Sequence, residues 1–252
     1  MLGEWLELGL LALAGFVSGC VNAVAGGGSL LVFPALLGTG LPPLAANVTN
    51  AVAQFPGFVG AVFSQRGDLR ANGRRLVPIS VAALLGSLGG CALLLSLPGA
   101  VFDAVVPALV GLSAVLMAFQ GRIRRWIGNP DQHGPDRSVL LTAGIFLASV
   151  YGGYFGGARS IILVVVLVLT ANAALSTLNA AKNLLGLLGS LVTVVVYALL
   201  APVDWAAVAA LVPTTLLGGM VGGRLARRLP AAALRWTVVV IAAAVALYMA
   251  LD

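Results

Sequence analysis

Two of the 14 cationic residues in this 252-residue chain, Arg159 and Lys182, fall inside segments that are otherwise apolar. A charge inside a bilayer-spanning segment costs about 3 kcal/mol on insertion scales and usually marks a pathway or a buried ion pair. No acidic residue lies inside an apolar segment, since Asp103 and Asp204 stand at segment ends. The two cations therefore predict a mobile anion as their partner. The alternative is that a side chain, Arg159 above all, reaches a membrane interface.

Two glycine-rich breaks each precede a short apolar run. Gly26–Ser29 leads into the run 29–41, and Tyr154-Phe155-Gly156-Gly157-Ala158 leads into the run 160–171. Glycine permits an unwound backbone, and the next helix begins with unpaired N–H groups at its positive end. Such helix starts bind anions readily. The alternative is that these glycines only allow helices to pack closely.

Amide and hydroxyl side chains accompany the breaks. They recur at helical spacing within 43–64 and again around Lys182. Such groups could ligate the oxygens of an oxyanion, or they could form hydrogen bonds between helices. The candidate substrate-binding residues are Lys182, Arg159, Gly26, Gly27, Gly28, Ser29, Asn50, Gln54, Gly156, Gly157, Asn179 and Asn183.

The composition defines the setting of these residues. The chain is 60% hydrophobic and only 9% charged, whereas soluble domains carry about 25% charged residues. A soluble protein of this size could not bury so much apolar surface, so the composition predicts an integral membrane protein. The long apolar runs are 8–25, 43–64, 76–97, 100–119, 139–155, 173–201, 204–225 and 231–251.

The remaining 12 cations are arginines in three short hydrophilic stretches, at 66–75, 122–137 and 224–235. Short basic loops stay cytoplasmic. If both short apolar runs cross the membrane, all three stretches reach one face. The pattern therefore favours ten membrane segments, with cytoplasmic loops at 65–75, 122–138 and 224–230 and both termini outside. Re-entrant short runs would instead move the third stretch to the other face. No soluble domain supports a nucleic-acid interface.

An internal repeat appears when the chain is shifted by 129 residues. Both halves then contain N-A-x-x-[QN]-x-x-G-x-x-G, beginning at Asn50 and Asn179. The predicted fold is an all-α membrane protein of two repeats of about five segments, 1–121 and 139–252, joined by the basic linker 122–138. An odd number of crossings inverts the second repeat, and inverted repeats with broken helices are typical of transporters. A channel could use the same architecture.

Several enzyme classes are excluded by missing motifs. The chain has no H-E-x-x-H and no G-x-x-x-x-G-K-[ST], and its one histidine, His133, lies in the central polar stretch. Cys20 and Cys91 fall inside apolar segments without a partner at metal-ligand spacing. No catalytic activity, metal or cofactor is expected. The absence of intramembrane carboxylates also argues against a carboxylate proton relay.

The order and spacing of several short motifs resemble the TauE/SafE family over essentially the whole chain. The motifs are Gly15-Phe16, Asn22-Ala23-Val24-Ala25-Gly26-Gly27-Gly28, Pro34-Ala35-Leu36, Gly40-Leu41-Pro42, Thr49-Asn50, Tyr151-Gly152-Gly153-Tyr154-Phe155-Gly156-Gly157, Asn179-Ala180-Ala181-Lys182 and Leu217-Gly218-Gly219-Met220-Val221-Gly222-Gly223-Arg224-Leu225. The resemblance implies a carrier of the bacterial or archaeal plasma membrane that exports sulfite, sulfoacetate or organic acids. The chain departs from many relatives in having Asn22 where they carry an acidic residue, in lacking their acidic residue near Gly152, and in having Ala51 where several carry lysine.

Together these observations predict a secondary carrier that exports a small anion, such as sulfite, an organosulfonate or a carboxylate, by alternating access. The alternatives are an anion channel and a non-transporting membrane scaffold. The expected partners are the anion and the lipid bilayer, without nucleic acid. A homo-oligomer is possible, but the sequence does not determine the oligomeric state, because lipid-facing and subunit-facing apolar surfaces look alike in sequence.

Overall fold

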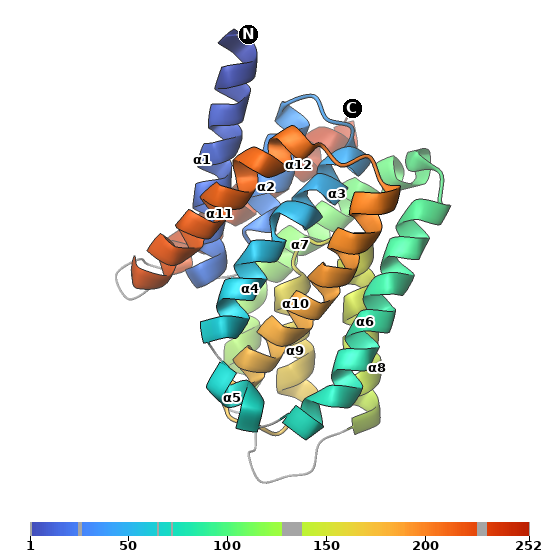
Figure 1. Cartoon of the computed structure of the whole chain (residues 1–252), viewed down its shortest axis with the longest axis vertical. Helices are drawn as coiled ribbons and strands as arrows, with labels where there is room; N and C mark the ends of the chain where they lie inside the picture. The colour runs from blue at the N-terminus through green and yellow to red at the C-terminus, as the bar shows by residue number, and fades with distance from the viewer. Residues whose placement is uncertain are drawn as a thin grey trace.

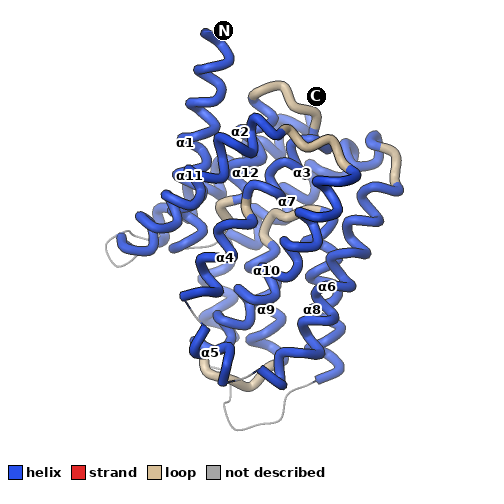
Figure 2. Tube along the Cα trace, in the orientation of Figure 1, coloured by secondary structure: helices blue, strands red, loops and turns tan. Residues whose placement is uncertain are grey.

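A computed structural model describes residues 2–24, 27–64, 66–71, 73–127, 138–225 and 231–251. The described residues form helices joined by short connections, without a β-strand among them (Figures 1 and 2). The all-α prediction is confirmed. The helices are α1 (Leu2–Val24), α2 (Ser29–Gly38), α3 (Pro43–Ala53), α4 (Phe55–Ser64), α5 (Arg66–Ala71), α6 (Gly73–Ser96), α7 (Gly99–Ile127), α8 (Ser138–Tyr154), α9 (Arg159–Thr170), α10 (Leu175–Leu200), α11 (Trp205–Leu225) and α12 (Ala231–Leu251).

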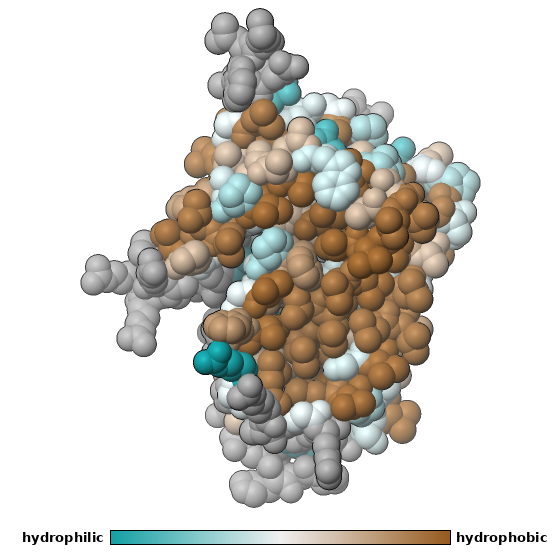
Figure 3. Space-filling view, viewed as in Figure 1, coloured by the Kyte–Doolittle hydropathy of each residue, from teal (hydrophilic) through white to brown (hydrophobic). Residues whose placement is uncertain are grey.

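The surface of the helical bundle is apolar over a broad area. Figure 3 shows hydrophobic side chains covering the middle of one face, and large apolar residues such as Val139 and Leu199 are 83% and 76% exposed. Within the described residues, three stretches are apolar over lengths sufficient to cross a bilayer: Leu76–Ser96, Gly99–Phe119 and Thr177–Leu200. Apolar surface of this extent requires lipid rather than water. The chain is therefore a helical membrane protein.

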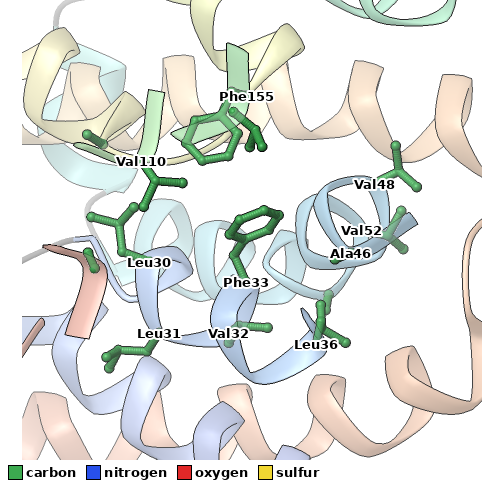
Figure 4. Packing of buried hydrophobic residues seen from close by; sticks show 14 of the residues in the cluster. Leu30, Leu31, Val32, Phe33, Leu36, Ala46, Val48, Val52, Val110 and Phe155 are labelled. Atoms are coloured by element: carbon green, nitrogen blue, oxygen red, sulfur yellow. The ribbon is translucent and has the colours of Figure 1, made fainter. Parts of the chain in front are cut away.

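The two short apolar runs form half-length helices. α2 contains 10 residues and α9 contains 12, so they are about 15 and 18 Å long at 1.5 Å per residue. A helix needs about 20 residues to span the hydrocarbon core. α2 buries Leu30, Val32, Phe33 and Leu36 in the main core (Figure 4). α9 is less enclosed, since it buries Ile161, Leu163 and Leu167 but leaves Leu169 53% exposed.

Three details differ from the segments expected from hydropathy. The run 43–64 is two helices, α3 and α4, interrupted at Gln54, because Pro56 supplies no N–H to continue the helix. The first basic stretch contains the short helix α5, and α7 continues beyond residue 119 to Ile127. Hydropathy alone does not reveal these features, since the mean hydropathy of a segment reports neither a break at a proline nor the secondary structure of a polar stretch.

The helices of the two halves are interleaved. α1 packs along α11 and α8 packs along α6, while α7 packs on α12. Figure 1 shows the α1–α11 pair on one side of the bundle and the α6–α8 pair on the other. Glycines permit both close approaches, since a Cβ at Gly19 would meet the Thr215 carbonyl oxygen and a Cβ at Gly90 that of Val150. Each half therefore contributes its first long helix to a pair with the other half.

Candidate functional site

The two glycine-rich breaks lie next to each other in the core. Phe33 of α2 packs edge-to-face on Phe155, with ring centroids 5.6 Å apart (Figure 4). A Cβ placed on Gly157 would lie 2.9 Å from Cδ2 of Leu30, at the start of α2. The fold thus brings together the two glycine-rich breaks, whose glycine pairs Gly27-Gly28 and Gly156-Gly157 are 129 residues apart in sequence.

The first break requires its glycines. Gly27 has φ of +84°, a left-handed conformation that glycine adopts without steric cost. Gly28 lies so close to the Ser18 carbonyl oxygen and to Asn22 that a Cβ would overlap both. The chain can therefore turn between α1 and α2 only with minimal side chains at these positions. Gly26, also predicted as a site residue, lies outside the described residues.

An amide network holds the first break together. The Gly28 N–H donates to Asn22 Oδ1 at 2.8 Å, and Asn22 Nδ2 donates to Gln54 Oε1 at 2.8 Å. Gln54 Nε2 in turn donates to Ser18 Oγ at 3.1 Å and to Asn50 Oδ1 at 3.4 Å. Asn50 Nδ2 donates to the Ser29 carbonyl oxygen at 3.1 Å. Asn50 and Gln54 are buried, whereas Asn22 is exposed at the edge of the network.

The carboxyl end of α8 is capped by side chains from several helices. The Gly152 carbonyl oxygen accepts from Arg159 Nη2 at 2.7 Å, and the Tyr154 carbonyl oxygen accepts from Asn47 Nδ2 at 3.0 Å. The Gly153 carbonyl oxygen accepts from the Tyr197 hydroxyl and from the Cys91 thiol. A helix end that is buried away from water needs such protein donors for its last carbonyl oxygens.

Arg159 is anchored in the core. It is 5% exposed, and besides Gly152 it donates through Nη1 to the Gly186 carbonyl oxygen at 3.3 Å and to Ser190 Oγ at 3.1 Å. The negative end of the α8 dipole lies at this guanidinium and stabilises its charge. No bonded carboxylate is found for it among the described residues. The result is a fixed cation beside the second break, which can attract an anion.

The other predicted residues differ in exposure. Lys182 is half-buried on α10, one turn before Gly186, and Asn183 is buried beside it, whereas Asn179 is exposed. Gly157 is buried and Gly156 half-buried. The structure therefore groups Ser29, Asn50 and Gln54 at the first break and Arg159 at the second, and it leaves the Asn179 side chain at the surface.

The sequence comparison identifies the family. Residues 11–249 match the family described as sulfite exporter TauE/SafE. The chain belongs to the TauE/SafE family. The resemblance seen in its motifs is thereby confirmed.

Relatives of this chain carry transporter names. The chain is 29% identical over 150 residues to "Probable membrane transporter protein ORF9" of Sinorhizobium, and 30% identical over 152 residues to a "Probable membrane transporter protein" of Haemophilus influenzae. These matches cover 59% of this chain and 56% and 57% of the two relatives, little more than half of their length. It is 28% identical to "Probable membrane transporter protein YfcA" of Escherichia coli K12, over 87% of this chain and 81% of that protein.

Several residues that shape the TauE/SafE breaks were not among the predicted site residues. Ser18 and Asn22 belong to the amide network, and Asn47, Cys91 and Tyr197 cap α8. The motif around the first break contains Asn22, which was a signal. Cys91 and Tyr197 gave none, because their partner is a backbone carbonyl oxygen on a helix distant in sequence. Within the described residues, no group of three or more potential metal ligands occurs.

Proposed function

We propose that this protein is a secondary carrier for small anions, exporting sulfite, an organosulfonate or a related organic acid across a bacterial or archaeal plasma membrane. The observation that carries the proposal is the meeting of two broken helices in the core with the buried cation Arg159 beside them. Discontinuous helices that meet near the midplane hold the substrate in many secondary transporters. The family and the names of the relatives support the same reading.

The proposed architecture is a pair of inverted repeats. A shift of 129 residues relates α1 to α8, α2 to α9, α6 to α11 and α7 to α12. Under that relation the packing of α1 on α11 corresponds to the packing of α8 on α6, and α2 on α12 corresponds to α9 on α7. This reciprocal packing supports a two-fold relation between the halves. We place ten segments in the membrane, with the basic loops cytoplasmic and both termini outside.

In this proposal the two cations and the two breaks contribute different interactions to anion binding. Lys182 and Arg159 provide countercharge, while the backbone of Gly26–Ser29 and of Gly156–Gly157 provides N–H donors. The side chains of Asn50, Gln54, Asn179 and Asn183 shape the site. Asn50 and Gln54 are hydrogen-bonded to each other. An anion that accepted from their N–H groups would replace hydrogen bonds between neutral amides, which are weaker than hydrogen bonds to a charged group.

Loss of the Lys182 charge tests this site. We expect Lys182→Gln to reduce uptake of radiolabelled sulfite into proteoliposomes by about tenfold or more, because a charge-assisted hydrogen bond contributes about 1.5–3 kcal/mol. The matched control is Arg122→Gln, which removes an exposed cation that stacks on Phe119 and should leave uptake unchanged. Normal uptake by the Lys182→Gln protein would contradict the role of Lys182.

A further inference from the structure

Two buried polar atoms in the described part of the chain have no hydrogen-bond partner: Ser87 Oγ on α6 and Arg159 Nε on α9. Ser87 is 0% exposed and Arg159 is 5% exposed. Buried polar groups in native proteins are nearly always bonded, so each exception needs an explanation. Arg159 cannot turn its Nε toward another acceptor without giving up Gly152 and Gly186, to which its Nη atoms are bonded.

The two side chains flank the same surface of α10. A Cβ on Gly189 would lie 2.7 Å from Ser87 Oγ and 3.1 Å from Arg159 Nη1. On the α8 side, a Cβ on Gly152 would overlap Arg159 Nε, and one on Gly153 would overlap the Ser87 carbonyl oxygen. Three glycines thus let α6, α8 and α10 approach one another closely around Ser87 and the guanidinium.

We propose that Ser87 Oγ and Arg159 Nε are donors of a buried subsite for a compact inorganic anion. Arg159 Nε–H can only donate, and the Ser87 hydroxyl can donate, so the guest must be an acceptor. The guanidinium charge excludes a cation. An anion suits the position better than water, because no carboxylate is bonded to Arg159 among the described residues and the anion supplies the missing charge.

We expect a compact guest, because Ser87, Gly152, Gly153 and Gly189 are all buried. Chloride and sulfite share the required chemistry, the first as a resident ion and the second as a transported one. The inference rests on the proposed function only in taking sulfite as a transported guest, and it adds Ser87, which no motif indicated.

Thermal unfolding of the purified full chain in detergent tests the subsite. Sodium chloride and sodium sulfite are titrated separately against sodium gluconate at constant ionic strength. Wild-type protein should gain stability with the anion that binds, and Ser87→Ala should weaken the apparent Kd at least tenfold. In gluconate alone, Ser87→Ala should be as stable as wild type or more stable, because it removes an unbonded hydroxyl. A shift with chloride alone identifies a resident ion, and a shift with sulfite identifies the transported guest.

Two further variants sharpen the result. Gly189→Ala places a methyl between Ser87 and the guanidinium and should abolish the anion-dependent shift. Ser113→Ala is the matched control, since Ser113 is equally buried but bonded to the Tyr151 hydroxyl at 2.8 Å; it should keep the shift. No shift in wild type, or an equal shift in Ser87→Ala, would overturn the subsite. Sulfite uptake that persists in either case would leave the proposed carrier standing, whereas a Ser87-dependent shift without any uptake would overturn the carrier alone.

Discussion

Arg159→Met is expected to lower the free energy of unfolding by about 3 kcal/mol. The methionine keeps an apolar stem of similar length but removes the donors to Gly152, Gly186 and Ser190. A hydrogen bond to a charged group contributes about 1.5–3 kcal/mol, and relief of the buried charge offsets part of the sum. The Gly152 carbonyl oxygen is then left without this donor at the end of α8. Reversible unfolding in mixed micelles measures the change.

Two controls separate capping of α8 from a general loss of charge. Arg122→Met removes an exposed arginine and should leave stability unchanged. Arg159→Lys retains the charge without the planar fork of donors, so its stability should fall between those of wild type and Arg159→Met. If Arg159→Met unfolds at the same denaturant concentration as wild type, the α8 end does not depend on this side chain.

Gly90→Ala is expected to cost about 3 kcal/mol or more, whereas Gly89→Ala should stay within about 1 kcal/mol of wild type. A Cβ at Gly90 would overlap the Val150 carbonyl oxygen and crowd the backbone of Gly153 and Tyr154, so α6 and α8 would have to separate. At Gly89 the nearest atom is 4.0 Å away, on the Val150 side chain. The same unfolding assay compares these adjacent glycines, and equal effects would contradict the close α6–α8 packing.

The second pair of helices offers an independent repeat of that comparison. A Cβ at Gly218 of α11 would overlap the Phe16 carbonyl oxygen of α1, whereas a Cβ at Gly219 would meet only the Gly19 carbonyl oxygen, at 4.0 Å. Gly218→Ala should therefore destabilise the protein and Gly219→Ala should not. The same contrast between adjacent glycines at both helix pairs would show that each pair depends on a close glycine contact.

The sequence predicted the fold more completely than the site. Apolar runs and glycine clusters were sufficient for the helices and for the two half-length elements, because both are local properties of the chain. The partners of Arg159 were not predictable, since the sequence offers only side chains as counterions while the fold supplies backbone carbonyl oxygens of Gly152 and Gly186. No motif in the sequence indicated Ser87. Its missing partner becomes visible only when α6, α8 and α10 are assembled.

For the predicted site residues, too, local spacing was predictable from the sequence and contacts between helices were not. Asn50 and Gln54 lie one helical turn apart, so their shared position in the amide network followed from their spacing. Asn179 and Asn183 have the same spacing, yet one is exposed and the other buried. Which side of α10 faces the core depends on its packing against α6, α9 and α4, which the spacing of two asparagines does not determine.

Counterflow distinguishes a carrier that transports anions by alternating access from a pore. Purified protein is reconstituted into liposomes loaded with a high concentration of unlabelled sulfite, and uptake of radiolabelled sulfite is followed over time. A carrier predicts saturable uptake that overshoots equilibrium and is faster than into empty liposomes. Flux that does not saturate and is not accelerated by internal sulfite would contradict the carrier and indicate a pore. If neither sulfite nor any sulfonate or carboxylate is taken up, anion transport itself would be contradicted.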